Sequence, residues 1–383
     1  MTSRAKPAGP APTGLERVAQ IAIVGLAGAV ALVYIAFGLV TASTTLGCDF
    51  FTYADAANRH LQSVAIYAVG SAHTGDCGLY QYPPPFLLFV LPFAALGHAG
   101  VWVWIAASIA AFATGCAILP VKPWIRLAVF LIGAVGWPFI FGLRIGQVVP
   151  LLYFLFAVGW RFLDRPAILG TVIGLGAIVK IQPGLIVLWL AARLQLRTIL
   201  IALATAGAVS VLAAAIGLAD WAGFVRILRD ISSAIDAPVN MSIGATLYRF
   251  GLDPAAAGAI QTANVVVLVV LVIWAGRRLG PVPGYLLVVT ASQIISPIVW
   301  SHYALILLLP VAWLLDRRQW WVIAIPLVHA WVLLPFVPNW TYTLAFYLTL
   351  VAIVIVGRRA ASPASGPVEA GATAITGASA APA

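Results

Sequence analysis

The sequence has few charged residues for its length. Asp, Glu, Lys and Arg make up only 8% of the 383 positions, against about 25% in a typical soluble domain. Hydrophobic residues make up 63%, well above the roughly 45–50% of soluble proteins. Because so little polar side chain is available to cover a water-exposed surface, the composition excludes a soluble globular protein and indicates a membrane protein with several spanning segments.

Signatures of nucleotide and metal chemistry are also missing. The sequence contains no Walker A motif, no Rossmann glycine pattern, and no H-E-x-x-H or C-x-x-C spacing. Acidic residues are too sparse for a cage around a hard cation, although Asp49 and Asp55 together could recruit one divalent ion. We therefore expect no metal and no cofactor. The net charge of +10 does not indicate nucleic acid, because the basic residues form short clusters between apolar runs.

The middle sections of the apolar runs carry almost no acidic or basic residues. Proton- and ion-coupled transporters normally keep such residues there, although each costs at least roughly 2.5–3.5 kcal/mol at the centre of a bilayer. Their absence weakens the hypothesis of a coupled transporter.

Apolar runs of 15 to 25 residues recur from Val18 to Val356, close to the length that a helix needs to cross a hydrocarbon core about 30 Å thick. The first run is too long for a signal peptide and has no A-x-A site after it, so we expect a retained helix. Basic clusters between the runs favour the cytoplasmic side. They predict cytoplasmic termini and twelve crossings, at approximately residues 18–42, 101–119, 126–142, 148–163, 167–181, 184–196, 199–218, 256–276, 281–295, 302–315, 320–336 and 341–357.

The chain is thus predicted to have three parts. Residues 1–17 form a cytoplasmic segment, residues 18–357 an all-α integral membrane domain, and residues 361–383, which lack large apolar side chains, a disordered cytoplasmic tail. Residues 85–97 are apolar but short for a span and are interrupted by Pro92, so we expect a re-entrant or partial helix.

Two long loops, residues 43–84 and 219–255, are predicted outside. Cys48 and Cys77 both fall in the first loop, where an oxidising exterior permits a bridge closing about 30 residues and worth about 3–4 kcal/mol. Two unpaired cysteines remain the alternative, because sequence fixes no distance. An amphipathic helix is predicted near residues 52–68, lying along the membrane surface. Its apolar stripe comprises Phe51, Ala54, Ala57, Leu61, Val64 and Tyr67.

Polar residues outside the basic clusters collect on the predicted outer face. They are Asp49, Tyr53, Asp55, Asn58, Arg59, His60, Tyr82, Arg144, Gln147, Lys180, Gln182, Asn240, Ser242, Arg249, Ser296, Trp300 and His302. This gathering predicts a binding or catalytic chamber at the outer surface.

Six short motifs lie on that face, in the order GCDFFTYADAA, YPPP, GQ, KIQP, NMSIGATLYR and SPIVWSHY. In these motifs the chain resembles glycosyltransferase family 87, from residue 15 to about residue 357. That family comprises GT-C-fold membrane enzymes, which include α-1,2-mannosyltransferases that use polyprenol-phosphate-mannose. Val149 stands where family members often have asparagine, and Met241 where they often have glutamine. These departures leave the sugar and the acceptor open.

The resemblance implies an inverting displacement in which Asp49 is the general base for the acceptor hydroxyl. Asp55 is the competing candidate; it lies nearly two helical turns further on and need not share the site. Within its KIQP motif Lys180, a compact point charge, is expected to hold the phosphate of the donor; a lysine that snorkels to the membrane surface is the alternative. Arg144, with its forked guanidinium, is a second candidate for the phosphate.

His302 lies beside Trp300, which favours contact with the donor phosphate or the sugar; an interfacial histidine next to a tryptophan of the aromatic belt is the alternative. Asn240 and Ser242 match an N-x-S sequon, but they precede a helix leading to Arg249 in the family pattern, which favours capping or substrate contact over a glycan. The remaining residues implied to bind substrate are Tyr53, Asp55, Arg59, Tyr82, Gln147, Gln182, Asn240 and Arg249.

These expectations combine into a GT-C-like bundle of about twelve transmembrane helices plus one partial helix. By resemblance, it moves a hexose, with mannose preferred, from a polyprenyl phosphate to a glycolipid or glycan acceptor at the outer face of the cytoplasmic membrane. The expected partners are this donor, this acceptor and membrane lipids. One alternative is a transporter or flippase for lipid-linked sugars, which needs no base and tolerates Asp49→Asn. Another is a scaffold for envelope enzymes, which tolerates loss of the whole outer polar set.

Overall fold

The computed structural model describes residues 14–42, 45–67, 79–232, 235–237, 239–330 and 338–361. Within these ranges the chain forms helices joined by short connections, and its β-type pairing is limited to an isolated bridge between Gly136 and Ala330. The predicted all-α fold is therefore confirmed. Most of the predicted N-terminal segment, the predicted tail after residue 361 and Cys77 lie outside the described residues.

The helices have the following bounds. In the first half of the chain they are α1 Gly14–Val40, α2 Cys48–Leu61, η1 Pro84–Phe86, α3 Leu87–Ala94, α4 His98–Ile118, α5 Pro123–Ala134, α6 Trp137–Ile145, α7 Val149–Arg161, α8 Pro166–Val179, η2 Gln182–Leu185 and α9 Ile186–Ala192. In the second half they are α10 Leu196–Ala215, α11 Trp221–Ser232, α12 Ile243–Arg249, α13 Pro254–Arg278, α14 Pro281–Ile294, η3 Ser301–Leu307, α15 Leu308–Asp316, η4 Trp320–Ile323, α16 Ala324–Leu327 and α17 Asn339–Ala361.

Four of the described helices are long and apolar enough to cross a membrane. They are α4, α10, α13 and the part of α17 from Asn339 to Arg359. Other apolar helical stretches, including Val149–Arg161 and Pro166–Val179, have 10–17 residues. The total of twelve crossings stays a prediction.

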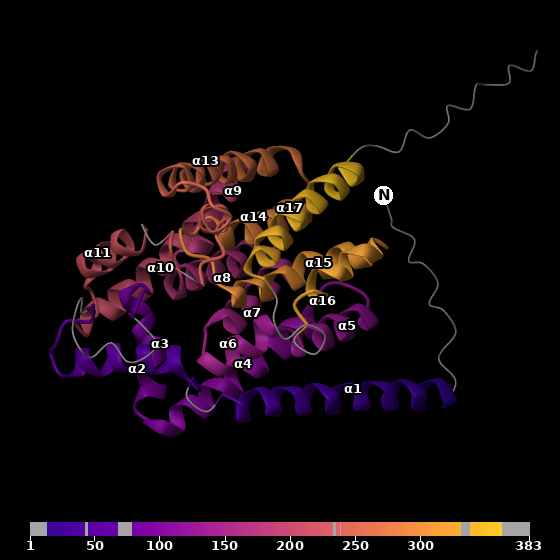
Figure 1. Cartoon of the computed structure of the whole chain (residues 1–383), viewed down its shortest axis with the longest axis horizontal. Coiled ribbons are helices and arrows are strands. Elements are labelled where there is room, and N and C mark those ends of the chain that lie inside the picture. Colours follow the sequence, from indigo (N-terminus) through magenta and orange to yellow (C-terminus); the bar gives the residue numbers. More distant parts are fainter. Residues whose placement is uncertain are drawn as a thin grey trace, which may run out of the picture.

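The helices are arranged between two ends of an elongated molecule. The long helix α1 runs along one edge, and α13 lies at the opposite edge (Figure 1). Helices α2, α3 and α11 are found toward the end where α1 finishes, whereas α5, α15 and the C-terminal end of α17 lie toward the other end (Figure 1). An ion pair of 3.5 Å between Lys122 and Asp316 joins the start of α5 to the end of α15.

The centre of the bundle is formed by α14 and α15. Every side chain from Pro283 to Ile294 is buried, and so is every side chain from Leu308 to Leu315. In contrast, α1 exposes large apolar side chains such as Leu26, Leu32 and Val33. An exposed apolar surface of this size suits contact with lipid, because water would not stabilise it.

The span predicted at residues 126–142 is divided in the structure. Helix α5 ends at Ala134 and α6 begins at Trp137, with extended backbone at Gly136 between them. The prediction of one continuous helix was wrong because hydrophobicity continues across the break, whereas Pro138 has no N–H for a bond to the preceding turn. Pro138 is tolerated in the first turn of α6, where that N–H is not needed.

The surface helix predicted near residues 52–68 is α2, which begins earlier and ends at Leu61. Its buried side chains are Phe50, Tyr53, Ala54, Ala56 and Ala57. Ala54, Ala57 and Tyr67 are buried as predicted, but Phe51, Leu61 and Val64 are 36%, 68% and 51% exposed. The stripe was wrong at these positions because the helix ends at Leu61, before Val64, and because Phe50 in place of Phe51 packs against Trp104 of α4, with ring centroids 5.7 Å apart.

The other two predicted non-spanning segments are also largely helical. Residues 85–97 contain the end of η1 and the short helix α3, with Pro92 inside it, which agrees with a partial helix. The predicted loop at residues 219–255 contains α11 and α12.

Candidate functional site

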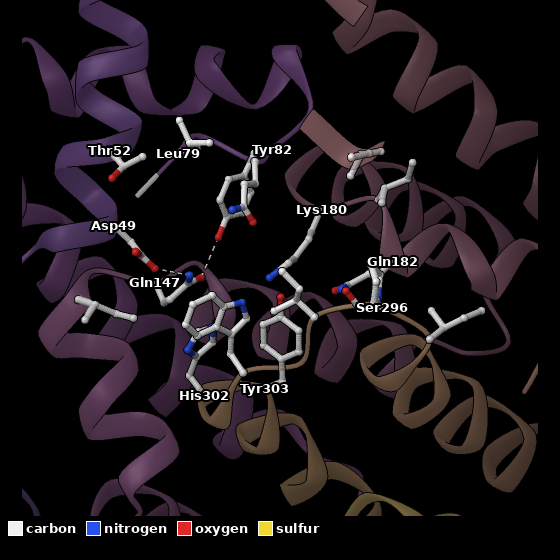
Figure 2. A pocket seen from close by; sticks show the side chains of 18 of the residues that line it. Asp49, Thr52, Leu79, Tyr82, Gln147, Lys180, Gln182, Ser296, His302 and Tyr303 are labelled. Atoms are coloured by element: carbon white, nitrogen blue, oxygen red, sulfur yellow. Dashed lines mark hydrogen bonds between the residues drawn. The ribbon is translucent and has the colours of Figure 1, made fainter. Parts of the chain in front are cut away.

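A cavity of about 760 Å³ lies among α2, the end of α6, the connection from α8 to α9, α11 and the segment between α14 and η3. Figure 2 shows polar side chains from these distant segments pointing toward one another. The predicted site residues that line it are Asp49, Tyr53, Tyr82, Gln147, Lys180, Gln182, Trp300 and His302.

Two glycines allow α2 and α6 to meet at this cavity. Gly146 ends α6 with a φ of +73°, and a Cβ atom there would lie 2.7 Å from the Cβ atom of Phe50. Gly47 precedes α2 with a φ of +74°, and its N–H donates to the main-chain oxygen of Arg144 at 2.6 Å. Since left-handed backbone and such close approach both favour glycine, these two positions place Gln147 beside Asp49.

We expect Gly146→Ala to lower the stability of the protein by at least about 1–2 kcal/mol, because a side chain in the left-handed region is strained and Phe50 must move. Thermal unfolding in detergent measures this loss. Gly207→Ala is the matched control: it lies within α10 with no atom within 4 Å of the added Cβ. Equal melting temperatures for the two variants would show that the α2–α6 contact does not depend on this glycine.

Asp49 lies in the first turn of α2 and faces the cavity. The side-chain N–H of Gln147 donates to Asp49 Oδ2. Burial raises the pKa of the Asp49 carboxyl to about 7, against the opposing effects of the Gln147 hydrogen bond and the charge of Lys180. A carboxylate with a pKa near neutrality can accept a proton more readily than an exposed aspartate.

Lys180 directly follows α8 and extends toward the centre of the cavity (Figure 2). Its Nζ lies 3.9 Å from the ring centroid of Tyr303 and 5.5 Å from that of Tyr82. Lys180 forms no ion pair with the described residues. The ammonium group is thus held by aromatic faces, which leaves its hydrogen-bond donors available to an anion.

The lining formed by Gln182, Trp300 and His302 carries polar atoms that lack protein partners. His302 is 1% exposed, and neither of its ring nitrogens has a hydrogen-bond partner. The Trp300 ring stacks on His302 at an interplanar angle of 15°. Gln182 Oε1 is likewise buried without a partner. Since such atoms are costly to bury unsatisfied, this wall is suited to a ligand rich in hydroxyl groups.

A group of apolar side chains, called here the apolar arm, also lines the cavity. It comprises Ile181, Leu185, Leu188, Leu228, Ile295 and Ile298, which lie on or beside η2, α9, α11 and the segment between α14 and η3. Ile181 is 53% exposed and Leu188 is 39% exposed. A cavity that combines polar lining, called here the polar chamber, with such an apolar arm can hold an amphiphilic ligand.

Asp55 and Arg59, both predicted at the site, form an ion pair of 3.2 Å with each other on α2. The Asp55 side chain is 47% exposed, and neither residue lines the cavity. Arg144 also lies outside the lining: its Nη2 donates to the main-chain oxygen of Thr41 at 3.3 Å, and its guanidinium lies over the ring of Trp137.

Asn240 holds the chain segment that carries Trp300. Asn240 is fully buried, and its Nδ2 donates to the main-chain oxygen of Pro297 at 2.9 Å, while its Oδ1 accepts from the N–H of Val299 at 3.1 Å. The Arg249 guanidinium donates to the main-chain oxygen of Asn240 at 2.5 Å. Both residues therefore act on the architecture beside the cavity, and neither lines it.

Ser242 caps α12, accepting a hydrogen bond from the N–H of Ala245. This confirms the capping alternative for the N-x-S motif.

We expect Asn240→Ala to lower stability by about 1–3 kcal/mol, because the buried N–H of Val299 loses its acceptor. It should also lower the affinity for substrates, since Trp300 and His302 come directly after the segment from Pro297 to Val299 that Asn240 holds. Thermal unfolding and the KM for the donor measure the two effects. Asn58→Ala, at an exposed position of α2, is the control. A fully stable Asn240→Ala protein would mean that the segment is held by other contacts.

Sequence reasoning missed Tyr303 and Leu228, both of which line the cavity. Tyr303 follows His302 within the SPIVWSHY motif, so its proximity to a predicted residue was an available signal. Leu228 lies in an ordinary amphipathic helix, and no local pattern distinguishes it.

The chain is thus a helical protein with helices long and apolar enough to span a membrane and with a polar cavity that an aspartate and a lysine line. A family model of glycosyltransferase family 87 matches residues 80–297, which is more than half of the chain. The chain belongs to glycosyltransferase family 87 and is a glycosyltransferase. No curated protein matches it. The matched residues include Tyr82, Gln147 and Lys180; Asp49 precedes them and His302 follows them.

Proposed function

We propose that this glycosyltransferase moves a hexose, with mannose preferred, from a polyprenyl phosphate to a glycolipid or glycan acceptor. The reaction takes place on the extracytoplasmic face of the cytoplasmic membrane. The observation that carries the proposal is that Asp49 and Lys180 line one cavity, whose lining also includes the apolar arm.

The chemistry follows from these positions. The oxygen of the acceptor hydroxyl attacks the anomeric carbon, and its proton passes to Asp49. The bond between the anomeric carbon and the phosphate oxygen breaks on the opposite face of the sugar, so the configuration inverts. Its electron pair stays on the polyprenyl phosphate, whose charge Lys180 stabilises.

The apolar arm supports a lipid-linked donor. A sugar joined to a polyprenyl phosphate has a polar head and a long apolar chain, which match the chamber and the arm respectively. A nucleoside diphosphate sugar has no such chain and would leave Ile181 and Leu188 without an apolar partner. Trp300 and His302 stack in parallel on the chamber wall and provide a surface against which a sugar ring can pack.

The test is a comparison of donors. Purified protein in detergent is given a purified glycolipid acceptor and a labelled hexose on either a polyprenyl phosphate or a nucleoside diphosphate, with no other lipid carrier added. We expect labelled product from the lipid-linked donor alone. Efficient transfer from the nucleoside diphosphate donor, when no lipid carrier is present, would overturn the assignment of the donor.

A further inference from the structure

A directed chain of hydrogen bonds ends on Asp49. The Tyr53 hydroxyl donates to the Tyr82 hydroxyl at 2.9 Å, and the Tyr82 hydroxyl donates to Gln147 Oε1 at 3.1 Å. Gln147 Nε2 then donates to Asp49 Oδ2. Figure 2 shows the last two of these interactions as dashed lines. The chain joins three segments that are far apart in the sequence.

The orientation of the Gln147 amide is fixed by this arrangement. Its Oε1 accepts from the Tyr82 hydroxyl and also from the N–H of Val148 at 3.0 Å. A carbonyl oxygen accepts and an amide nitrogen donates, so Oε1 must face these two donors and Nε2 must face Asp49. If the Gln147 amide were rotated by half a turn, its Nε2 donor would face the donors of Tyr82 and Val148. Its Oε1 acceptor would then face the Asp49 carboxylate.

The Tyr82 hydroxyl is itself held in place. It accepts from Tyr53, so its proton is directed to Gln147. The main-chain oxygen of Tyr82 accepts from the hydroxyl of Tyr67 at 2.5 Å. Tyr82 is 7% exposed and Gln147 is 6% exposed, so water has little access to replace these interactions.

We propose that Tyr82 is a positioning residue for the transfer reaction: through the Gln147 amide it fixes the direction and the proton affinity of the Asp49 carboxylate. This inference rests on the proposed function, in which Asp49 is the base. Because Gln147 binds Oδ2 and none of the described residues donates a hydrogen bond to Oδ1, Oδ1 is the oxygen that takes the proton of the acceptor. Tyr82 thereby acts on the base, and not on the substrate.

The hydrogen bond from Gln147 lowers the pKa of Asp49, against the larger effect of burial. Its loss should therefore raise this pKa further and move the acid limb of the activity profile to higher pH. The other ionisable groups that face Asp49 are Lys180 after α8, Tyr53 on α2 itself, Tyr82 before η1, and Tyr303 and His302 on η3. A substitution of the Tyr82 hydroxyl alters the hydrogen bond and leaves the charge of each of these other groups in place.

The test compares Tyr82→Phe with Tyr80→Phe. Tyr80 is a matched control, because its buried hydroxyl donates to the main-chain oxygen of Pro83 at 3.1 Å and it does not line the cavity. We expect Tyr82→Phe to lower kcat about tenfold, with little change in the KM for the donor and an acid limb at higher pH. Tyr80→Phe should keep kcat within about twofold and leave the acid limb where it is.

A double-mutant cycle tests whether Tyr82 acts through Gln147. Gln147→Leu alone should lower kcat by about 10- to 100-fold, because it removes the donor to Asp49. Adding Tyr82→Phe to Gln147→Leu should cause no further loss beyond about twofold, since the two residues serve the same interaction. Melting temperatures of all the variants separate these effects from unfolding.

Three outcomes would overturn this inference. The first is a pH profile and a kcat for Tyr82→Phe that equal those of Tyr80→Phe, while Asp49→Asn is inactive. The second is a raised KM for the donor at unchanged kcat, which would make Tyr82 a substrate-binding residue. The third is full additivity with Gln147→Leu. Wild-type activity of Asp49→Asn would instead refute the proposed base itself, so the two failures can be told apart.

Discussion

Asp49→Asn is expected to reduce sugar transfer by roughly 10²–10⁴-fold, the usual contribution of a general base. Asparagine has nearly the same shape as aspartate and can still accept a hydrogen bond from Gln147, so the cavity should persist. It has no basic oxygen for the proton of the acceptor hydroxyl. Transfer of labelled sugar by wild-type and variant protein at equal expression measures the effect.

Asp55→Asn is the matched comparison, because it changes the same chemical group on the same helix. Asp55 pairs with Arg59 and does not line the cavity; its side chain is 47% exposed, whereas that of Arg59 is 13% exposed. The amide oxygen of an asparagine at position 55 can still accept a hydrogen bond from the Arg59 guanidinium. We therefore expect near wild-type transfer. If Asp55→Asn were inactive and Asp49→Asn active, Asp55 would be the base.

The pH profile provides a second measure of the same role. Burial raises the pKa of Asp49 to about 7, and a base must be deprotonated to act. The kcat/KM of the wild-type enzyme should accordingly fall as the pH drops through about 7. An exposed aspartate would sustain activity down to about pH 4, so full activity at pH 5 would show that Asp49 is not the group that limits the reaction.

Lys180→Met is expected to weaken donor binding by roughly 10- to 100-fold, because a hydrogen bond to a charged group contributes about 1.5–3 kcal/mol. Methionine retains a long apolar stem that can lie against Tyr303 and Tyr82, so the change removes mainly the charge. The KM for the polyprenyl phosphate donor, with melting temperature as a check on folding, is the appropriate measurement.

Lys122→Met serves as the control for Lys180→Met. Lys122 lies at the start of α5, is 53% exposed and pairs with Asp316 at the end of α15. It does not line the cavity. Its substitution should leave the KM for the donor unchanged. A Lys180→Met enzyme that binds the donor as tightly as Lys122→Met would show that another group holds the phosphate.

The long helices could be predicted because length and hydrophobicity determine them locally. Helices α4 and α13 fall close to the predicted spans at residues 101–119 and 256–276. The break before α6 could not be read from hydrophobicity, which is continuous there. It follows from Pro138, which lacks the N–H that a continuous helix needs, and the extended backbone at Gly136 pairs instead with Ala330, far along the chain.

The members of the candidate site were only partly predictable for the same reason. Local pattern and family resemblance select residue types on one face, but they do not determine which side chains converge. Arg59 and Arg144 are equally polar in sequence, yet Arg59 pairs with Asp55 and Arg144 contacts Thr41. Asn240 does not line the cavity, but its side chain holds the segment before Trp300 through hydrogen bonds to Pro297 and Val299, which are 57 and 59 residues further along the chain.

The most direct measurement uses purified protein in vesicles that contain a labelled polyprenyl-phosphate hexose and an acceptor glycolipid. The assay follows both the label joined to the acceptor and the movement of intact donor between the leaflets. A glycosyltransferase with Asp49 as base forms labelled acceptor in the wild type and almost none in Asp49→Asn. Movement of intact donor without labelled acceptor, at the same rate in both proteins, would identify a flippase and rule out transfer at this cavity.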